Sequence, residues 1–203
     1  MLSYLDPILF PDQCEILEVG PDRYVYPIFK NGSSSLLAAN PRKLNYFEMR
    51  ELRTVEVFLR EPFERYVSGV QTYLRQNTHL DRATALTMID EYLFLNSHFS
   101  LQFHWIVNLQ KFTDAWMYFR PIEELHTATD HTWNVLARDE TLVNYFGNNK
   151  KLNYYLQLDK ILYEDFMGQT VSLKQIIRFI QTNHHTLYNE VIDRSIQICN
   201  VLD

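Results

Sequence analysis

Three short apolar runs, each closed by a polar or proline-containing turn, restrict the folds open to this chain more than any other feature. They occupy residues 23–29, 54–59 and 115–119 and are rich in β-branched and aromatic side chains. Runs of this length and composition are typical of buried strands, and segments with helical periodicity lie between them. Strands that alternate with helices predict an α/β fold with a mainly parallel sheet flanked by helices.

The remaining segments predict how the chain is organised. Residues 1–22 are expected to form an extended lead-in with at most one short strand at 16–19, and residues 171–203 a C-terminal helix. Pro62 suits the first turn of a helix that follows the second strand. Further helices are expected at 82–95, 98–111, 131–145, 153–167 and 172–198. No repeat and no glycine- or serine-rich linker interrupts the sequence, so residues 1–203 are predicted to form one domain.

Charge and composition exclude several classes of protein. With 25 acidic and 19 basic side chains the net charge is -6, which argues against non-specific nucleic-acid binding but leaves room for a local basic pocket. Cys14 and Cys199 form neither a disulfide framework nor a zinc site, and no His, Cys or carboxylate cluster has the spacing of metal ligands. Residues 1–9 lack the pattern of a signal peptide, and the longest uncharged stretch, 92–110, is too polar to span a bilayer. We therefore expect a soluble, cytoplasmic protein with no membrane, nucleic-acid or metal partner.

The first two predicted strands end in residues suited to binding an anion. In open α/β sheets, ligands bind outside the carboxyl ends of the strands. After the first strand comes the segment Lys30-Asn31-Gly32-Ser33-Ser34-Ser35, in which small residues let backbone N–H groups converge on an anion. After the second strand comes Arg60, whose guanidinium group suits phosphate oxygens, with Ser68 about two helical turns later.

Each segment also has an ordinary explanation. A lysine before a Gly-Ser turn is in most sequences an exposed loop, and residues 30–35 do not form a Walker A loop. Arg60 and Arg65 would equally well pair with Glu61 and Glu64 on a solvated helix face. Neither segment alone decides between a phosphate site and an exposed surface.

Taken together and in this order, the two segments resemble the signatures of the sulfotransferases that use 3′-phosphoadenosine 5′-phosphosulfate (PAPS). Lys30, Gly32, Ser33 and Ser34 match that family's 5′-phosphosulfate loop, PKxGST, with Phe29 in the place of the proline. The family's 3′-phosphate motif, RxPxxRxxS, is matched in full by four residues: Arg60, Pro62, Arg65 and Ser68. The surrounding sequence FLREPFERYVSG is especially similar to the carbohydrate sulfotransferases of the Golgi type.

The resemblance implies a fold, a cofactor and a division of roles. It implies a P-loop-like three-layer α/β fold and a metal-independent transfer of a sulfuryl group from PAPS to an acceptor. The similarity to the carbohydrate branch implies a carbohydrate hydroxyl as this acceptor, with a small-molecule acceptor as the alternative. Lys30 would stabilise the leaving oxygen, and the loop from Lys30 to Ser35 would hold the 5′-phosphate. Arg60 and Ser68 would hold the 3′-phosphate, while Arg65 would tie the helix to the sheet. Lys150, in a segment similar to the family's NK element, would reach the cofactor from the C-terminal side.

The general base is the least determined of these roles. His98 lies in a segment that resembles the family's HWxPQ element, and its ordinary pKa suits proton transfer near neutral pH. Glu51 is the second candidate, because the interval between the two signatures holds no histidine. The ordinary alternatives are a solvated surface role for Glu51 and a hydrogen-bonded position in an apolar helix for His98.

The sequence also allows two other functions, and it leaves open whether the chain forms a homodimer. The first is a nucleotide-binding module without turnover. The second is a P-loop kinase, which the missing Walker A loop disfavours. An apolar stripe in the C-terminal helix either covers the core of this chain or forms a homodimer contact; its members are Ile176, Ile180, Leu187 and Val191.

Overall fold

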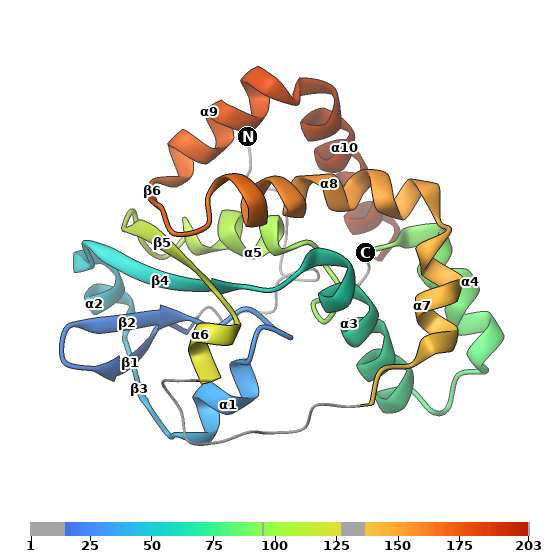
Figure 1. The fold of residues 1–203 in the computed structure, drawn as a ribbon, viewed down its shortest axis with the longest axis horizontal. Coiled ribbons are helices and arrows are strands. Elements are labelled where there is room, and N and C mark those ends of the chain that lie inside the picture. Colours follow the sequence, from blue (N-terminus) through green and yellow to red (C-terminus); the bar gives the residue numbers. More distant parts are fainter. Residues whose placement is uncertain (1–14, 95, 127–136, 203) are drawn as a thin grey trace.

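The computed structural model describes residues 15–94, 96–126 and 137–202, which form an α/β fold around a six-stranded sheet of order β3-β1-β2-β4-β5-β6 (Figure 1). The central strands β2 (Arg23–Tyr26), β4 (Thr54–Leu59) and β5 (Trp116–Pro121) are parallel. The outer pairings, which involve β1 (Leu17–Gly20), β3 (Arg42–Lys43) and β6 (Thr170–Val171), are antiparallel. The α/β class is therefore confirmed, but the parallel arrangement holds only for the centre of a mixed sheet.

Proline determines two of the boundaries beside the sheet. β2 ends at Tyr26, earlier than expected, because Pro27 has no N–H to donate to a neighbouring strand. β4 spans Thr54–Leu59 as predicted, and Pro62 occupies the first turn of α3 (Pro62–Gln76), where the missing N–H has no helical partner to lose. The side chain of Glu61 caps this helix by accepting from the N–H of Glu64.

The helices expected at 82–95, 98–111, 131–145 and 153–167 are present with shifted ends, whereas the short helices at 46–51 and 123–126 were not predicted. α5 begins at Gln102 rather than at residue 98, and part of the expected helix at 131–145 lies outside the described residues. The remaining helices are α1 (Ser33–Ala38), α2 (Tyr46–Glu51), α4 (Arg82–Tyr92), α5 (Gln102–Leu109), α6 (Glu123–His126), α7 (Glu140–Gly147), α8 (Lys150–Asp165), α9 (Leu173–Asn183) and α10 (His185–Leu202).

The single C-terminal helix expected for 171–203 is wrong. Val171 belongs to β6, a capping box between Ser172 and Gln175 starts α9, and the chain leaves helical geometry at His184. The break lets α10 fold back against α9 and α8 (Figure 1). The predicted apolar stripe is buried in the main core, so its side chains cover this chain itself.

The sheet separates two unequal apolar clusters. On one face Val55, Val57 and Leu59 join the large core with residues of α3, α5 and α8. On the other face Phe58 packs in a small cluster that includes Leu36 of α1 and Leu125 of α6, and Figure 1 shows these two helices together on that side. None of the helices in the described ranges has the length and hydropathy needed to cross a membrane.

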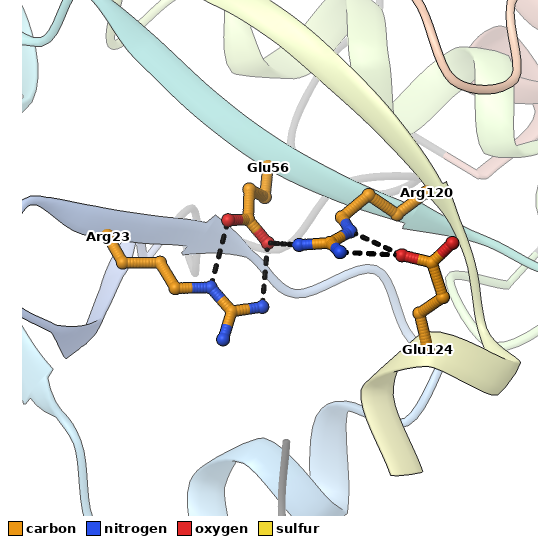
Figure 2. A network of polar contacts seen from close by, with 4 residues as sticks. All are labelled: Arg23, Glu56, Arg120 and Glu124. Carbon is orange, nitrogen blue, oxygen red and sulfur yellow. Dashed lines mark hydrogen bonds and ion pairs between the residues drawn. The ribbon is translucent and has the colours of Figure 1, made fainter. Parts of the chain in front are cut away.

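A ladder of four charged side chains lies on the face that carries α6 (Figure 2). Both oxygens of Glu56 accept from Arg23, each at 2.9 Å, and Arg120 Nη1 donates to Glu56 Oε2 at 3.2 Å. Arg120 also donates to Glu124 at 2.7 Å. The ladder thereby joins the three central strands and α6 through paired charges of opposite sign.

Candidate functional site

The candidate site lies at the carboxyl ends of β2 and β4. These strands are adjacent and parallel, with Tyr26 paired to Val57, so the segments that follow them leave the same edge of the sheet. Arg60 Nη1 donates to the carbonyl oxygen of Lys30 at 3.4 Å, which joins the two segments directly. We call residues 30–35 together with Arg60 the cradle.

The backbone of the cradle turns sharply at two residues. Lys30 has φ 69° and Gly32 has φ 76°, both in the left-handed region that glycine tolerates and other residues rarely adopt. A Cβ at Gly32 would lie 2.3 Å from Cδ2 of Leu125, so the side chain of Leu125 would have to shift to admit any other residue there. Of the three serines that follow, Ser33 and Ser35 are buried and Ser34 is exposed.

Three cationic side chains meet here without a carboxylate partner. Among the described residues, no carboxylate oxygen lies within 4.0 Å of the charged nitrogens of Lys30, Arg60 or Arg65. Burial lowers the pKa of Lys30, and the charges of Arg60 and Arg65 lower it further. Burial also lowers the pKa of Arg60, against the opposing charges of nearby glutamates. The cradle is therefore a locally positive region on a chain of net negative charge, and an anion would relieve the repulsion within it.

Arg65 is the buried member of this group and has a different environment. Its Nε donates to the carbonyl of Phe29 at 3.1 Å, and its Nη1 donates to the carbonyl of Ser100. Burial lowers the pKa of Arg65 to about 10, while the charge of Asp159 opposes the shift. Arg65 thus connects α3 to the loop after β2, and its Nη2 has no hydrogen-bond partner among the described residues.

Two buried side-chain amides connect the two halves of the cradle: Asn31 within it and Gln102 beneath it. Asn31 Nδ2 donates to the carbonyl of Phe58 at 2.7 Å and to Oε1 of Gln102 at 2.6 Å. Gln102 in turn exchanges two bonds with the backbone of Arg60: the N–H of Arg60 donates to Oε1, and Nε2 donates to the carbonyl, both at 3.0 Å. Asn31 and Gln102 therefore link the two halves of the cradle through groups that are almost completely buried.

Asp159 of α8 supports this arrangement from the other side. Its carboxylate accepts from the N–H of Gln102 at 2.7 Å and from the N–H of Phe103 at 2.9 Å. These two N–H groups belong to the first turn of α5, where they have no acceptor within the helix. Burial raises the pKa of Asp159 to about 6, against the charge of Arg65 and the two backbone hydrogen bonds. No role was predicted for Gln102 or Asp159 from the sequence. The signal for Gln102 was its place at the glutamine of the segment that resembles the family's HWxPQ element, and Asp159 had none.

His98 lies beside the cradle, near the charges of Lys30 and Arg65. Its ring stacks on that of Phe29 with centroids 5.4 Å apart. Burial, followed by the charges of Lys30 and Arg65, lowers the pKa of His98 to about 4. Because its pKa is about 4, the imidazole of His98 is neutral at pH 7. The backbone of His98 packs closely against Gly69 of α3, where a Cβ would lie 2.1 Å from the carbonyl oxygen of His98.

Two of the expected site residues are not brought to the cradle. Glu51 ends α2 just before β4, so the six residues of that strand, about 20 Å, separate it from Arg60. It lines a hollow of about 730 Å³ at the amino end of the strand. Lys150 is exposed at the start of α8, about 13 Å along the helix from Asp159. Ser68 is half-buried on α3, three residues after Arg65 and thus on the same side of the helix.

The comparisons with known proteins assign no family to this chain. No protein-family model matches it, and neither the curated proteins nor the solved structures contain a match. Among the described residues, no group of three or more His, Cys, Asp or Glu side chains is placed to hold a metal ion.

Proposed function

We propose that this protein is a sulfotransferase that moves a sulfuryl group from PAPS to an acceptor hydroxyl, in a P-loop-like arrangement. The observation that carries the proposal is the convergence of Lys30 and Arg60 at the ends of two adjacent parallel strands, with no carboxylate partner among the described residues. The RxPxxRxxS motif supports it, since its first arginine leaves a strand and its proline begins a helix.

PAPS carries phosphate groups at two positions, and each half of the cradle offers hydrogen-bond donors for one of them. Lys30 and the loop to Ser35 would hold the 5′-phosphate, with exposed Ser34 as the accessible hydroxyl. Arg60 and Ser68 would hold the 3′-phosphate, which distinguishes this nucleotide from ATP and AMP. A guanidinium group suits this role because it presents a planar fork of donors to phosphate oxygens.

The reaction needs positioning and charge stabilisation more than covalent help from the protein. The acceptor oxygen would form a bond to sulfur as the bond from sulfur to the 5′-phosphate oxygen breaks, and the electron pair of that bond would stay on the phosphate. The ammonium group of Lys30 would stabilise the growing charge on that oxygen. Neutral His98 would take the proton from the acceptor hydroxyl. Glu51, distant from the cradle, is not retained as a base.

A module that binds the nucleotide without turnover is the second candidate. The low pKa of His98, about 4, favours it, because so weak a base removes a hydroxyl proton poorly. The acceptor in the first proposal is a carbohydrate hydroxyl, following the similarity of the motifs to the carbohydrate branch of the family; a small-molecule hydroxyl is the alternative.

The test compares nucleotides by calorimetry in the absence of magnesium. We expect 3′-phosphoadenosine 5′-phosphate to bind about 10- to 150-fold more tightly than AMP, the range of one charged hydrogen-bonded contact. Equal affinities would contradict the proposal. Release of 3′-phosphoadenosine 5′-phosphate from PAPS in the presence of sugar acceptors then supports the enzyme, whereas binding without release over a broad panel supports the module.

A further inference from the structure

We propose that Gln102 is a positioning residue that sets the spacing between the two halves of the cradle. The inference rests on the proposed function only for the choice of nucleotide probes. The spacing itself is a property of the free protein. Gln102 is 71 residues from Asn31 and 42 from Arg60 in the sequence, so its amide joins three distant segments.

The contacts of Gln102 are divided between the two halves. Its Oε1 accepts from Asn31, which belongs to the loop after β2, and from the N–H of Arg60, which follows β4. Its Nε2 donates to the carbonyl of Arg60. One side chain thus spans both loops, and lengthening either contact would change the distance between Lys30 and Arg60.

The burial of Gln102 excludes a direct role in binding a ligand. The side chain is completely buried, and its acceptor oxygen is already shared by two donors. Asp159 holds the backbone of Gln102 at the start of α5, so the amide is supported by a helix that is itself buried. Gln102 therefore acts through the cradle residues and not on the ligand.

A rigid spacing has a measurable consequence for a ligand with two separated phosphates. When both halves of a site are fixed at the right distance, the second phosphate binds at a high effective concentration. A nucleotide with one phosphate does not benefit from that spacing. Loss of Gln102 should therefore weaken the bisphosphate much more than either monophosphate.

The first measurement uses the full chain without any ligand. Gln102→Leu removes the amide at nearly constant volume, and Gln157→Leu is the matched control, because Gln157 is exposed and donates only to the carbonyl of Asn153 one helical turn earlier. We expect amide hydrogen exchange at Arg60 to accelerate about tenfold in Gln102→Leu and not in the control, because the N–H of Arg60 loses a buried acceptor. Unchanged exchange at Arg60 would overturn the proposal.

The second measurement uses three probes: 3′-phosphoadenosine 5′-phosphate, AMP and adenosine 3′-monophosphate. In Gln102→Leu we expect the affinity for the bisphosphate to fall about 10- to 100-fold while each monophosphate changes less than about threefold. Equal losses for all three probes would overturn the positioning role. If the wild type binds none of them, the proposed function fails, and the exchange result still decides the role of Gln102.

A second variant covers the case in which Gln102→Leu does not fold. Gln102→Glu keeps the length of the side chain and an oxygen that accepts from Asn31 and Arg60, and it loses the bond from Nε2 to the carbonyl of Arg60. We expect exchange at Arg60 to stay close to that of the wild type in this variant. Loss of protection at Arg60 despite the retained acceptor would contradict the assignment of Oε1 as the group that holds the two halves.

Discussion

One group of basic side chains lies on the central parallel strands and another on the segments that follow two of these strands, and their surroundings are opposite. In the ladder, Arg23 and Arg120 both donate to Glu56, and Arg120 also pairs with Glu124 (Figure 2). In the cradle, Lys30 and Arg60 share a positive region that no carboxylate within 4.0 Å neutralises, as far as the described residues extend. The ladder occupies the middle of the sheet, and the cradle its carboxyl edge.

The difference separates a structural use of arginine from a functional one. Burial alone would raise the pKa of Glu56, but the hydrogen bonds and charges of Arg23 and Arg120 outweigh it, and the pKa is lowered. The ladder thus satisfies its charges inside the protein. In the cradle, burial and then the charges of Arg60 and Arg65 lower the pKa of Lys30. Cations that have no carboxylate within 4.0 Å in the described part of the chain favour an external anion.

The largest effect is expected for Lys30→Ala. Turnover of PAPS should fall by about 10²–10³, the range for removal of one preorganised electrostatic donor, while nucleotide affinity falls less. Steady-state kinetics and calorimetry measure the two quantities separately. Lys43→Ala is the control, since that lysine is exposed and pairs with Glu15 at 2.7 Å. Turnover of Lys30→Ala at the level of the control would remove Lys30 from the chemistry.

A smaller effect is expected for Arg60→Ala. The affinity for 3′-phosphoadenosine 5′-phosphate should fall about 10- to 150-fold, with little change for AMP, because the lost contact is to the 3′-phosphate. The backbone bonds of Arg60 to Gln102 do not require its side chain, so the fold should persist. Arg23→Ala, in the ladder, should leave both affinities unchanged. Equal losses in the two arginine variants would erase the distinction between ladder and cradle.

The smallest effect is expected in the ladder itself. Glu56→Gln should lower the free energy of unfolding by about 1 kcal/mol at pH 7, since the pairs are partly exposed and screened by solvent. Because the pKa of Glu56 is lowered in the folded state, its contribution is fully present above the ordinary value of 4.5 and is lost progressively as the pH falls from there through the lowered folded-state pKa. Urea unfolding at pH 7 and pH 3 measures the loss at each pH.

Nucleotide affinity is the control for this last variant. Glu56→Gln should bind 3′-phosphoadenosine 5′-phosphate as the wild type does, because the ladder makes no contact with the cradle in the bonds described above. A stability difference as large at pH 3 as at pH 7, or a loss of nucleotide affinity, would show that the ladder does more than pair charges across the strands.

The segments nearest the proposed site were predictable because the sequence features that determine them act between near neighbours in the chain. The run at 54–59 is the strand β4, and Pro62 begins α3, since proline and the pattern of apolar residues act over a few positions of the chain. The placement of Lys30 and Arg60 at one edge follows from the parallel pairing of their strands. The break at His184 was not predictable from the apolar pattern, which continues through both α9 and α10.

The sequence by itself determined the α/β class, the central strand and the basic residues that follow the strand ends. Only the tertiary structure decided that Glu51 lies at the opposite end of β4, that the sheet is mixed, and that Gln102 and Asp159 lie beneath the cradle. The physical reason is the separation along the sequence over which each interaction acts. Dihedral preferences and periodicity act between near neighbours, whereas the bond from Asn31 to Gln102 spans 71 residues and forms only when the sheet and α5 pack together.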